Sequence, residues 1–367
     1  MWRHVAVPWI GLSNPGPLGH RPPVHITPMI AMLVYVVRLW EGEYYTRDAS
    51  GGVEAAPVQS RLWRIQADGS GRMPLTGGEG RDEHPLVTSD GRWIYYQTNP
   101  GNRWQIRRMR TDGTGNVLVA PTDATHHAYG AVLARAGGHL TWTRQAGREG
   151  AVVLSAADGS ESRSIAPDWG YVYMAAPDAT GQQVVFSGPA RGYRLGLARA
   201  PDWVPVQLTP DHPDSYVPRF TPDGRTVVFI RRDGGLYRIE ADGTRLQRLA
   251  EGVQVEFFLT PEDKHGSTDE PAISPDGTRI AFVRSERNRP PQIAVVNMDG
   301  SDLRVLTDLP GTCGRVQWSP DGRWLAFVSF VGRWPQLWVM PADGSAPPRQ
   351  ITQEQGAVYA LSWIPAA

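Results

Sequence analysis

The sequence predicts an all-β protein, a seven-bladed β-propeller, and three observations point to this fold class. The tetrapeptide T-P-D-G or S-P-D-G occurs at 221–224, 274–277 and 319–322, each time directly before an apolar run. A second D-G dipeptide follows each copy, as at 299–300. The resulting period of roughly 40 to 50 residues is typical of four-stranded propeller blades. The third observation is that strand-like segments at the two ends of the chain complete one blade only when they are combined.

The repeated tetrapeptide predicts a tight turn between the first and second strands of each blade. Proline presets φ for the first central position of a β-turn, aspartate can accept hydrogen bonds from its own backbone, and glycine supplies a positive φ. The second D-G predicts the turn between the third and fourth strands. We interpret these aspartates as turn formers rather than as calcium ligands or catalytic groups.

The elements follow in order along the chain. Residues 1–28 are rich in proline and glycine and predict an irregular N-terminal extension, followed by a single propeller domain over 29–367. Strands are expected over 30–39, 62–66 and 72–76, as the second, third and fourth strands of an opening blade. Six further repeats then cover 84–119, 129–165, 171–209, 216–249, 271–307 and 316–352.

Closure of the ring depends on the last segment. Residues 357–365 read A-V-Y-A-L-S-W-I-P, an isolated first strand with no second strand after it. We predict that this strand completes the blade that the N-terminal segments begin, which gives seven blades and removes the open sheet edges. Six blades with a stray hairpin is the alternative count.

The S-P-D-G…D-G…L-T repeat resembles the PD40 (WD40-like) repeat of the TolB-like β-propellers, over nearly the whole chain after residue 28. That resemblance implies a propeller used for binding or interaction. The chain is also similar to the oligogalacturonate lyases, whose propeller holds a divalent metal through histidines, including a late Q-x-x-H-x-H pattern. The late segment here has Gln353 and Gln355 but no histidine after His265, and G-x-S-x-G, the serine-hydrolase motif, is absent from the chain.

Composition narrows the choice of partners. The 37 basic and 37 acidic residues cancel, which argues against a nucleic-acid partner. The apolar run at 29–37 is shorter than a membrane span, and its flanks are not those of a secretory signal, which favours the cytoplasm over the periplasm. The single cysteine, Cys313, allows no disulfide within the chain. We expect a monomer that needs no cofactor.

Long insertions predict a binding face. Loops after second and fourth strands lie on one face of a propeller, and the segments at 40–60, 251–269 and 330–335 all fall there. Aromatic and arginine side chains are the usual anchors of binding surfaces. The candidates in these loops are Trp40, Tyr44, Tyr45, Arg47, Phe257, Phe258, Lys264, His265, Arg333 and Trp334.

Polar residues near the start of each first strand predict the mouth of the central channel on the same face. They are Glu83, His84, His126, His127, Tyr171, Asp214, Tyr216, Glu270, Arg315 and Tyr359. Such a set is expected to line a water-filled polar channel, and the histidines and carboxylates could alternatively hold a metal or serve acid–base chemistry. The sequence therefore favours a non-enzymatic binding module for a protein, peptide or glycan. The alternative is a polysaccharide-active enzyme with its site at the channel mouth.

Overall fold

The computed structural model of the 367-residue chain describes residues 31–40, 45–47, 53–55, 58–77, 80–120, 126–134, 136, 138–146, 149–166, 169, 172–188, 193–212, 214–253 and 270–366. The extension predicted over 1–28 lies outside these residues. No helix in the described ranges has the length and hydropathy that a membrane span requires.

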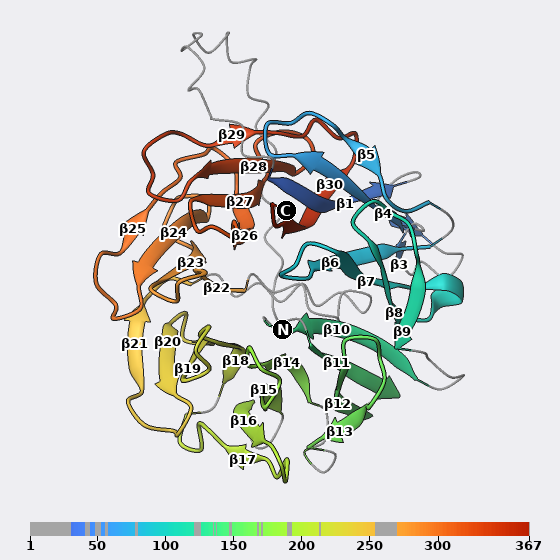
Figure 1. Cartoon of the computed structure of the whole chain (residues 1–367). Helices are drawn as coiled ribbons and strands as arrows, with labels where there is room; N and C mark the ends of the chain where they lie inside the picture. Colours follow the sequence, from blue (N-terminus) through green and yellow to red (C-terminus); the bar gives the residue numbers. More distant parts are fainter. Residues whose placement is uncertain are drawn as a thin grey trace.

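Seven four-stranded antiparallel sheets form a ring around a central axis, which confirms the predicted propeller (Figure 1). The strands of each blade are given from the innermost outward. Blade 1 consists of β30 (Ala357–Ile364), β1 (Met32–Trp40), β4 (Val58–Gln66) and β5 (Met73–Pro74), and blade 2 of β6 (Asp82–Val87), β7 (Trp93–Thr98), β8 (Gln105–Arg110) and β9 (Val117–Ala120). Blade 3 consists of β10 (His127–Leu133), β11 (His139–Ala146), β12 (Glu149–Ala156) and β13 (Arg163–Ile165), and blade 4 of β14 (Tyr173–Pro177), β15 (Gln183–Gly188), β16 (Arg194–Arg199) and β17 (Val206–Gln207).

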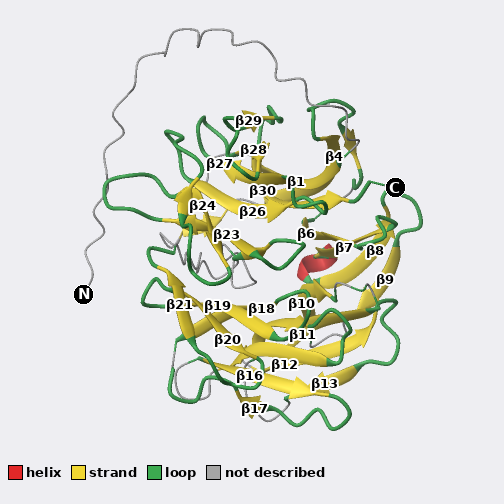
Figure 2. Cartoon of the chain, turned by 60° about the vertical axis from the view of Figure 1, so that its left-hand side comes forward, coloured by secondary structure: helices red, strands yellow, loops and turns green. Residues whose placement is uncertain are grey.

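Blades 5 to 7 continue the same order. Blade 5 consists of β18 (Ser215–Phe220), β19 (Thr226–Arg231), β20 (Leu236–Glu240) and β21 (Gln247–Ala250). Blade 6 consists of β22 (Ala272–Ile273), β23 (Arg279–Arg284), β24 (Gln292–Asn297) and β25 (Arg304–Val305), and blade 7 of β26 (Cys313–Trp318), β27 (Trp324–Ser329), β28 (Gln336–Pro341) and β29 (Arg349–Gln350). A short hairpin of β2 (Tyr45–Arg47) and β3 (Val53–Ala55) follows β1. A 3-10 turn, η1 (Pro100–Asn102), follows β7 (Figure 2).

The two ends of the chain close the ring as predicted. Strand β30 pairs antiparallel with β1, with Met32 opposite Ile364 and Arg38 opposite Ala357. The side chains of Val358 and Trp363 are buried in a core shared by blades 7 and 1. The count is therefore seven blades and not six.

In the first-turn tetrapeptide the serine or threonine hydroxyl, as well as the aspartate, forms hydrogen bonds that close the turn. The Thr221 hydroxyl donates to Asp223 at 2.6 Å and accepts from the backbone N–H of Thr226 at 3.1 Å. The carboxylate of Asp223 also accepts from the backbone N–H of Arg225. The turns that begin at Thr88, Ser274 and Ser319 repeat this pattern. The interpretation of these aspartates as turn formers is confirmed.

The second D-G turn also links neighbouring blades. Arginines from the third or fourth strand of one blade donate to a backbone carbonyl in the D-G turn of the next. Six of the blade junctions show this link: Arg64 to Thr111, Arg108 to Ala157, Arg199 to Ala241, Arg238 to Met298, Arg304 to Asp343 and Arg349 to Ala67. The repeat therefore carries both the hairpin and the contact between blades.

The turn aspartates predict a loss of stability in acid. Hydrogen bonds from Thr221 and Ser274 lower the pKa of Asp223 and Asp276 below the usual 3.8. A carboxyl group with a depressed folded-state pKa stabilises the protein above pH 3.8 and loses that contribution as pH falls through the folded value. We expect the Asp223→Asn/Asp276→Asn variant to melt about 1–3 °C lower at neutral pH, with a flatter dependence on pH below about 4.

Thermal melting followed by circular dichroism between about pH 7 and about pH 2 checks this result. The exposed Asp202, changed to Asn, is the matched control and should leave the profile unaltered. Equal pH profiles for the wild type and the double variant would contradict the assignment.

Candidate functional site

A backbone irregularity in the innermost strands shapes the channel mouth. Each of β6, β10, β14, β18 and β26 shifts register against its second strand, and one residue near that shift has a positive φ. These residues are His84 (51°), Gly130 (63°), Met174 (53°), Val217 (53°) and Arg315 (57°). A positive φ is uncommon for residues other than glycine and persists only where the surrounding structure imposes it. The repeat thus places a residue of unusual backbone conformation at the same point of the innermost strand in each of these five blades.

In blades 6 and 1 the equivalent positions are occupied by Glu270 and Tyr359. His84, Val217 and Arg315 each lie four residues before the serine or threonine that opens the first turn, and Glu270 has the same spacing in blade 6. In β30 the extra residue at the register shift is Tyr359. Tyr359, His84, Glu270 and Arg315 therefore occupy one polar sector, formed by blades 6, 7, 1 and 2.

The central feature of this sector is a buried ion pair. The carboxylate of Glu83 accepts from the guanidinium of Arg38 at 3.0 Å and from the hydroxyl of Ser60 at 3.4 Å. Only 6% of the Glu83 side chain and 16% of the Arg38 side chain are exposed. The Arg38 guanidinium also lies 4.3 Å from the centre of the Tyr359 ring, and His84 meets the same ring edge-on with the ring centres 6.3 Å apart. We call these residues, with Arg315 and Glu270, the channel-mouth cluster.

Burial sets the charge state of the cluster. Burial by itself would raise the pKa of Glu83, but the attraction of Arg38 opposes it, and the pKa of Glu83 lies below its usual value. Burial lowers the pKa of His84 to about 4, although Glu83 acts in the opposite direction. Burial, together with the charge of Glu83, raises the pKa of Tyr359 well above its usual value. At neutral pH the cluster thus holds a carboxylate, a neutral imidazole and a neutral phenol.

Two further charges face this group. Arg315 and Glu270 both act electrostatically on His84, Arg315 lowering its pKa and Glu270 raising it. Glu270 forms an ion pair with Arg219 of β18. The cluster therefore offers fixed positive and negative groups at short range, an arrangement suited to holding the polar groups of a ligand.

Five of the ten residues predicted for the channel mouth come together here: Glu83, His84, Glu270, Arg315 and Tyr359. Sequence reasoning missed Arg38 and Ser60, which lie at the end of β1 and within β4. The signal for Arg38 was an arginine inside the apolar run V-Y-V-V-R-L-W, where only a buried partner makes a charge acceptable.

The other predicted channel residues that the structure describes have different partners. The Nδ1 atom of His127 lies 3.4 Å from the backbone N–H of Trp104 in the neighbouring blade, and His126 directly precedes β10. Tyr216 donates to Asp214 at 3.0 Å and accepts from Arg232, and its ring packs against Tyr193. Tyr171 lies outside the described residues. Within the described ranges no group of three or more histidine, cysteine, aspartate or glutamate residues could hold a metal ion.

The predicted binding face is described in part. Trp40 ends β1, and Tyr45 and Arg47 begin and end β2, which pairs with β3. In blade 7 the Arg333 guanidinium lies 5.3 Å from the Trp334 ring. Tyr44, Phe257, Phe258, Lys264 and His265 fall outside the described residues.

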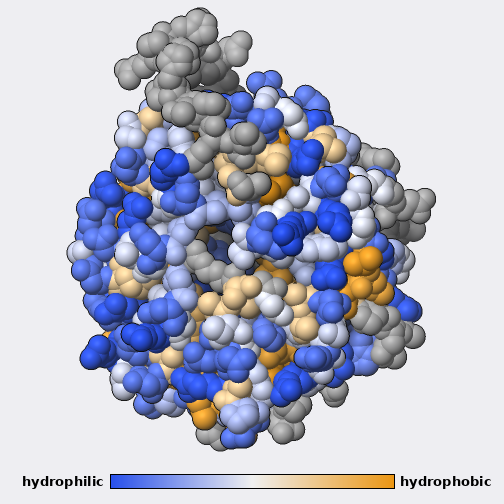
Figure 3. Space-filling model, in the orientation of Figure 1, coloured by the Kyte–Doolittle hydropathy of each residue, from blue (hydrophilic) through white to orange (hydrophobic). Residues whose placement is uncertain are grey.

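The blade 7 loop also exposes two large apolar side chains that were not among the selected candidates. Phe330 is 52% exposed and Val331 is 39% exposed. The loop ends beside the channel, because the backbone N–H of Val358 in β30 donates to the carbonyl of Pro335. An exposed apolar loop thus adjoins the strand that carries Tyr359. A space-filling view shows one face of the ring hollowed near the axis and mostly hydrophilic around it (Figure 3).

Comparisons with known proteins agree on the fold. No known family model matches the chain. It is 27% identical over 126 residues to the uncharacterized protein Atu1656 of Agrobacterium fabrum, and the aligned region covers 31% of this chain and 39% of that protein. It is 39% identical over 54 residues to the Tol-Pal system protein TolB of Nitratidesulfovibrio vulgaris, which covers 15% of this chain and 12% of TolB. The chain thus matches less than half the length of either relative.

Solved structures with the same architecture include proteins of different function. TolB from Acinetobacter baumannii superposes with a TM-score of 0.53 at 13% identity, over 91% of this chain and 67% of TolB. Oligogalacturonate lyase from Vibrio parahaemolyticus superposes with a TM-score of 0.59 at 12% identity, over 83% of this chain and 90% of the lyase. A puromycin-hydrolyzing peptidase from Mycobacterium tuberculosis superposes with a TM-score of 0.62 at 14% identity, over 80% of this chain and 50% of the peptidase. At such identities the likeness establishes the shared propeller fold alone.

Proposed function

From the premise that this chain is a TolB-like β-propeller of seven blades, we propose that it is a binding module. Its partner is a protein or peptide that contacts the blade 7 loop and inserts polar groups into the channel mouth. The observation that carries the proposal is that the loop with the exposed Phe330 and Val331 ends at Pro335, whose carbonyl accepts from the backbone N–H of Val358, the residue next to Tyr359 in β30. Exposed apolar anchors beside fixed charges are typical of sites that recognise extended segments of a partner.

The two parts of the site supply different kinds of binding energy. Burying the exposed half of Phe330 against a partner would contribute about 0.8–1.5 kcal/mol through the hydrophobic effect, half the value for a fully exposed side chain. The channel-mouth groups add selectivity, because Arg315 and Glu270 present opposite charges, one held by a bulged strand and the other by its ion pair with Arg219. A rigid propeller that binds as a monomer needs no rearrangement for this role.

Selection from a phage-displayed library of random peptides tests the proposal. We expect the wild-type protein to enrich peptides whose binding falls at least about tenfold in the Phe330→Ala/Val331→Ala variant and in Arg315→Ala. The matched control is Val204→Ala/Val206→Ala, which removes comparably exposed apolar groups from the outer edge of blade 4. Enriched peptides that bind all four proteins equally, or no enrichment at all, would overturn the proposal.

A polysaccharide-active enzyme is the second candidate, favoured by a neutral, partly buried imidazole, His84, next to Tyr359 and within reach of the charge of Arg315. Neutral imidazoles of this kind can act as general bases. The described residues do not fit a bound divalent metal, because they contain no cluster of metal ligands. Incubation with polygalacturonate, with and without added manganese, tests for an unsaturated product by ultraviolet absorbance. Product that disappears in His84→Ala would favour this candidate over the binding module.

A further inference from the structure

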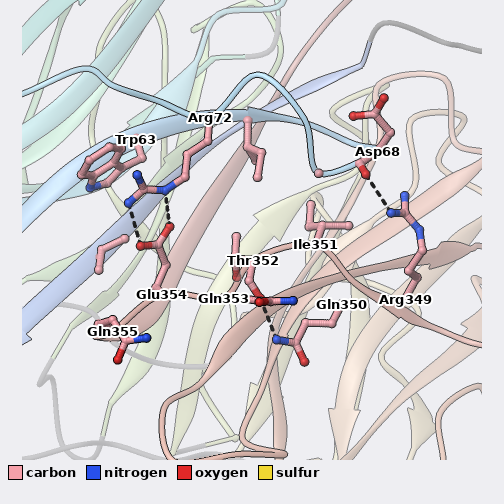
Figure 4. A pocket seen from close by; sticks show the side chains of 13 residues that line it. Trp63, Asp68, Arg72, Arg349, Gln350, Ile351, Thr352, Gln353, Glu354 and Gln355 are labelled. Carbon is pink, nitrogen blue, oxygen red and sulfur yellow. Dashed lines mark hydrogen bonds and ion pairs between the residues drawn. The ribbon is translucent and has the colours of Figure 1, made fainter. Parts of the chain in front are cut away.

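A cavity of about 770 Å³ lies away from the channel, at the seam where blade 7 meets blade 1. Its apolar side is formed by Val37, Ile65 and Ile351, and its polar rim by side chains from the segment that follows β29 (Figure 4). The volume falls within the range of small-molecule sites, about 300–1,000 Å³. We refer to it as the seam cavity.

One wall of the seam cavity is a polar cluster that joins the two ends of the chain. Arg72 donates to both oxygens of Glu354, at 2.6 and 2.7 Å, and its guanidinium lies 3.6 Å from the centre of the Trp63 ring. The phenol of Tyr35 donates to the same carboxylate at 2.7 Å. Only 8% of the Glu354 side chain is exposed. Burial and the hydrogen bond to Glu354 raise the pKa of Tyr35, so its proton stays in place at neutral pH.

The neighbouring seam, between blades 6 and 7, has an apolar version of this cluster. Tyr35 lies opposite Trp63 in the strand register, as Phe327 lies opposite Trp338. Glu354 donates its backbone N–H to Gln336, as Leu309 does to Gln292.

The side chains at matching positions therefore differ in polarity. Phe327, Leu309 and Trp338 belong to a single hydrophobic core cluster, whereas the closing seam has a phenol and a carboxylate in place of the phenyl ring and the leucine.

This difference is not required to pack two blades together. Enclosing the Glu354 carboxylate carries a desolvation penalty, although the Arg72 side chain remains 42% exposed, and replacing buried ionic groups with apolar groups of similar volume is often neutral or stabilising. The same chain demonstrates the apolar solution one seam away. Polar groups retained at such a position are a sign of a functional site.

The composition of the cavity indicates the chemistry of its ligand. The charges of Arg72 and Arg349 are balanced by Glu354 and Asp68, so the lining is neutral overall. The exposed amides of Gln353 and Gln355 make no hydrogen bond to other described residues and can both donate and accept. A neutral ligand that has many hydroxyl groups on one side and an apolar face on the other matches this lining.

We propose that the seam cavity binds a neutral saccharide, with its apolar face toward the aliphatic floor of Val37, Ile65 and Ile351 and its hydroxyls toward the glutamines and the Arg72–Glu354 pair. Sugar rings present C–H groups that pack on apolar side chains and hydroxyls that pair with amides and carboxylates. This inference is independent of the proposed function, because the seam cavity and the channel-mouth cluster share no residue.

Saturation-transfer NMR with a panel of neutral saccharides tests the proposal: glucose, galactose, mannose, N-acetylglucosamine and their disaccharides. We expect at least one to bind, and Gln353→Ala/Gln355→Ala to weaken binding by at least about tenfold. Tyr35→Phe/Glu354→Leu, which copies the apolar seam, should abolish binding while melting at the same temperature or higher. Arg315→Ala is the matched control in the channel mouth and should bind as the wild type does.

Several outcomes would overturn the proposal. They are no binding by any saccharide of the panel, binding that survives in Tyr35→Phe/Glu354→Leu, or binding that is lost in Arg315→Ala and so belongs to the channel. A large drop in the melting temperature of Tyr35→Phe/Glu354→Leu would also overturn it, because the cluster would then serve closure of the ring. Competition by a peptide but not by a sugar would assign the cavity to a different ligand.

Discussion

Removal of residues 356–367 is expected to leave a chain that does not form a stable native ring. The deletion takes away β30, exposes the full edge of β1, and removes the buried side chains of Val358, Leu361, Trp363 and Ile364. Burial of four such side chains contributes about 6–12 kcal/mol, at about 1.5–3 kcal/mol each. That sum is comparable with the whole stability of a typical domain, about 5–15 kcal/mol.

Circular dichroism and size-exclusion chromatography measure the effect. The truncated chain should lose its cooperative thermal transition and aggregate through the open strand edge. A chain that ends at Pro365 is the matched control and should melt as the full chain does. A synthetic peptide of residues 356–367, added in excess, should restore a cooperative transition. A truncated chain that melts at the wild-type temperature would contradict closure by β30.

The second large effect is expected at the buried pair of the channel mouth. Replacing Arg38 with Met leaves the Glu83 carboxylate buried without its main positive partner. Removing one member of a buried pair typically costs about 3–5 kcal/mol. We therefore expect the free energy of unfolding of Arg38→Met to fall by about this amount at neutral pH, measured by chemical denaturation.

The pH dependence of this loss follows from the pKa of Glu83. In the wild type the folded-state pKa lies below the ordinary value of 4.5, so the group stabilises the protein above that pH and loses its contribution in acid. Without Arg38, burial dominates and the folded-state pKa rises, which favours the protonated form. The difference between the two proteins should therefore shrink as pH falls below about 5.

The double variant Arg38→Met/Glu83→Met separates the cost of an unpaired charge from the net contribution of the pair. We expect it to recover most of the stability lost in Arg38→Met, since both charges are then absent. If the single and double variants were equally unstable, the loss would come from packing around Arg38 rather than from the unpaired carboxylate.

Only part of the channel-mouth cluster could be predicted from the sequence. Glu83, His84, Glu270, Arg315 and Tyr359 could be assigned to the channel mouth because each lies near the start of a predicted first strand. Arg38 lies 45 positions from Glu83 in the sequence, and only the closed ring makes them neighbours. The positive φ of His84 and Arg315 has no sequence signal either, because these residue types rarely adopt that conformation alone.

The sequence by itself determined the propeller fold, the turn chemistry and the strand that closes the ring, and the structure decided between seven blades and six. These features are local and repeated, so each copy of the tetrapeptide supports the same conclusion. Only the tertiary structure decided which charges meet, as in Arg38 with Glu83, and Glu354 with Tyr35 across 319 positions of sequence. The physical reason is that a buried charge selects its partner by proximity in space, which closure of the ring creates and local sequence does not encode.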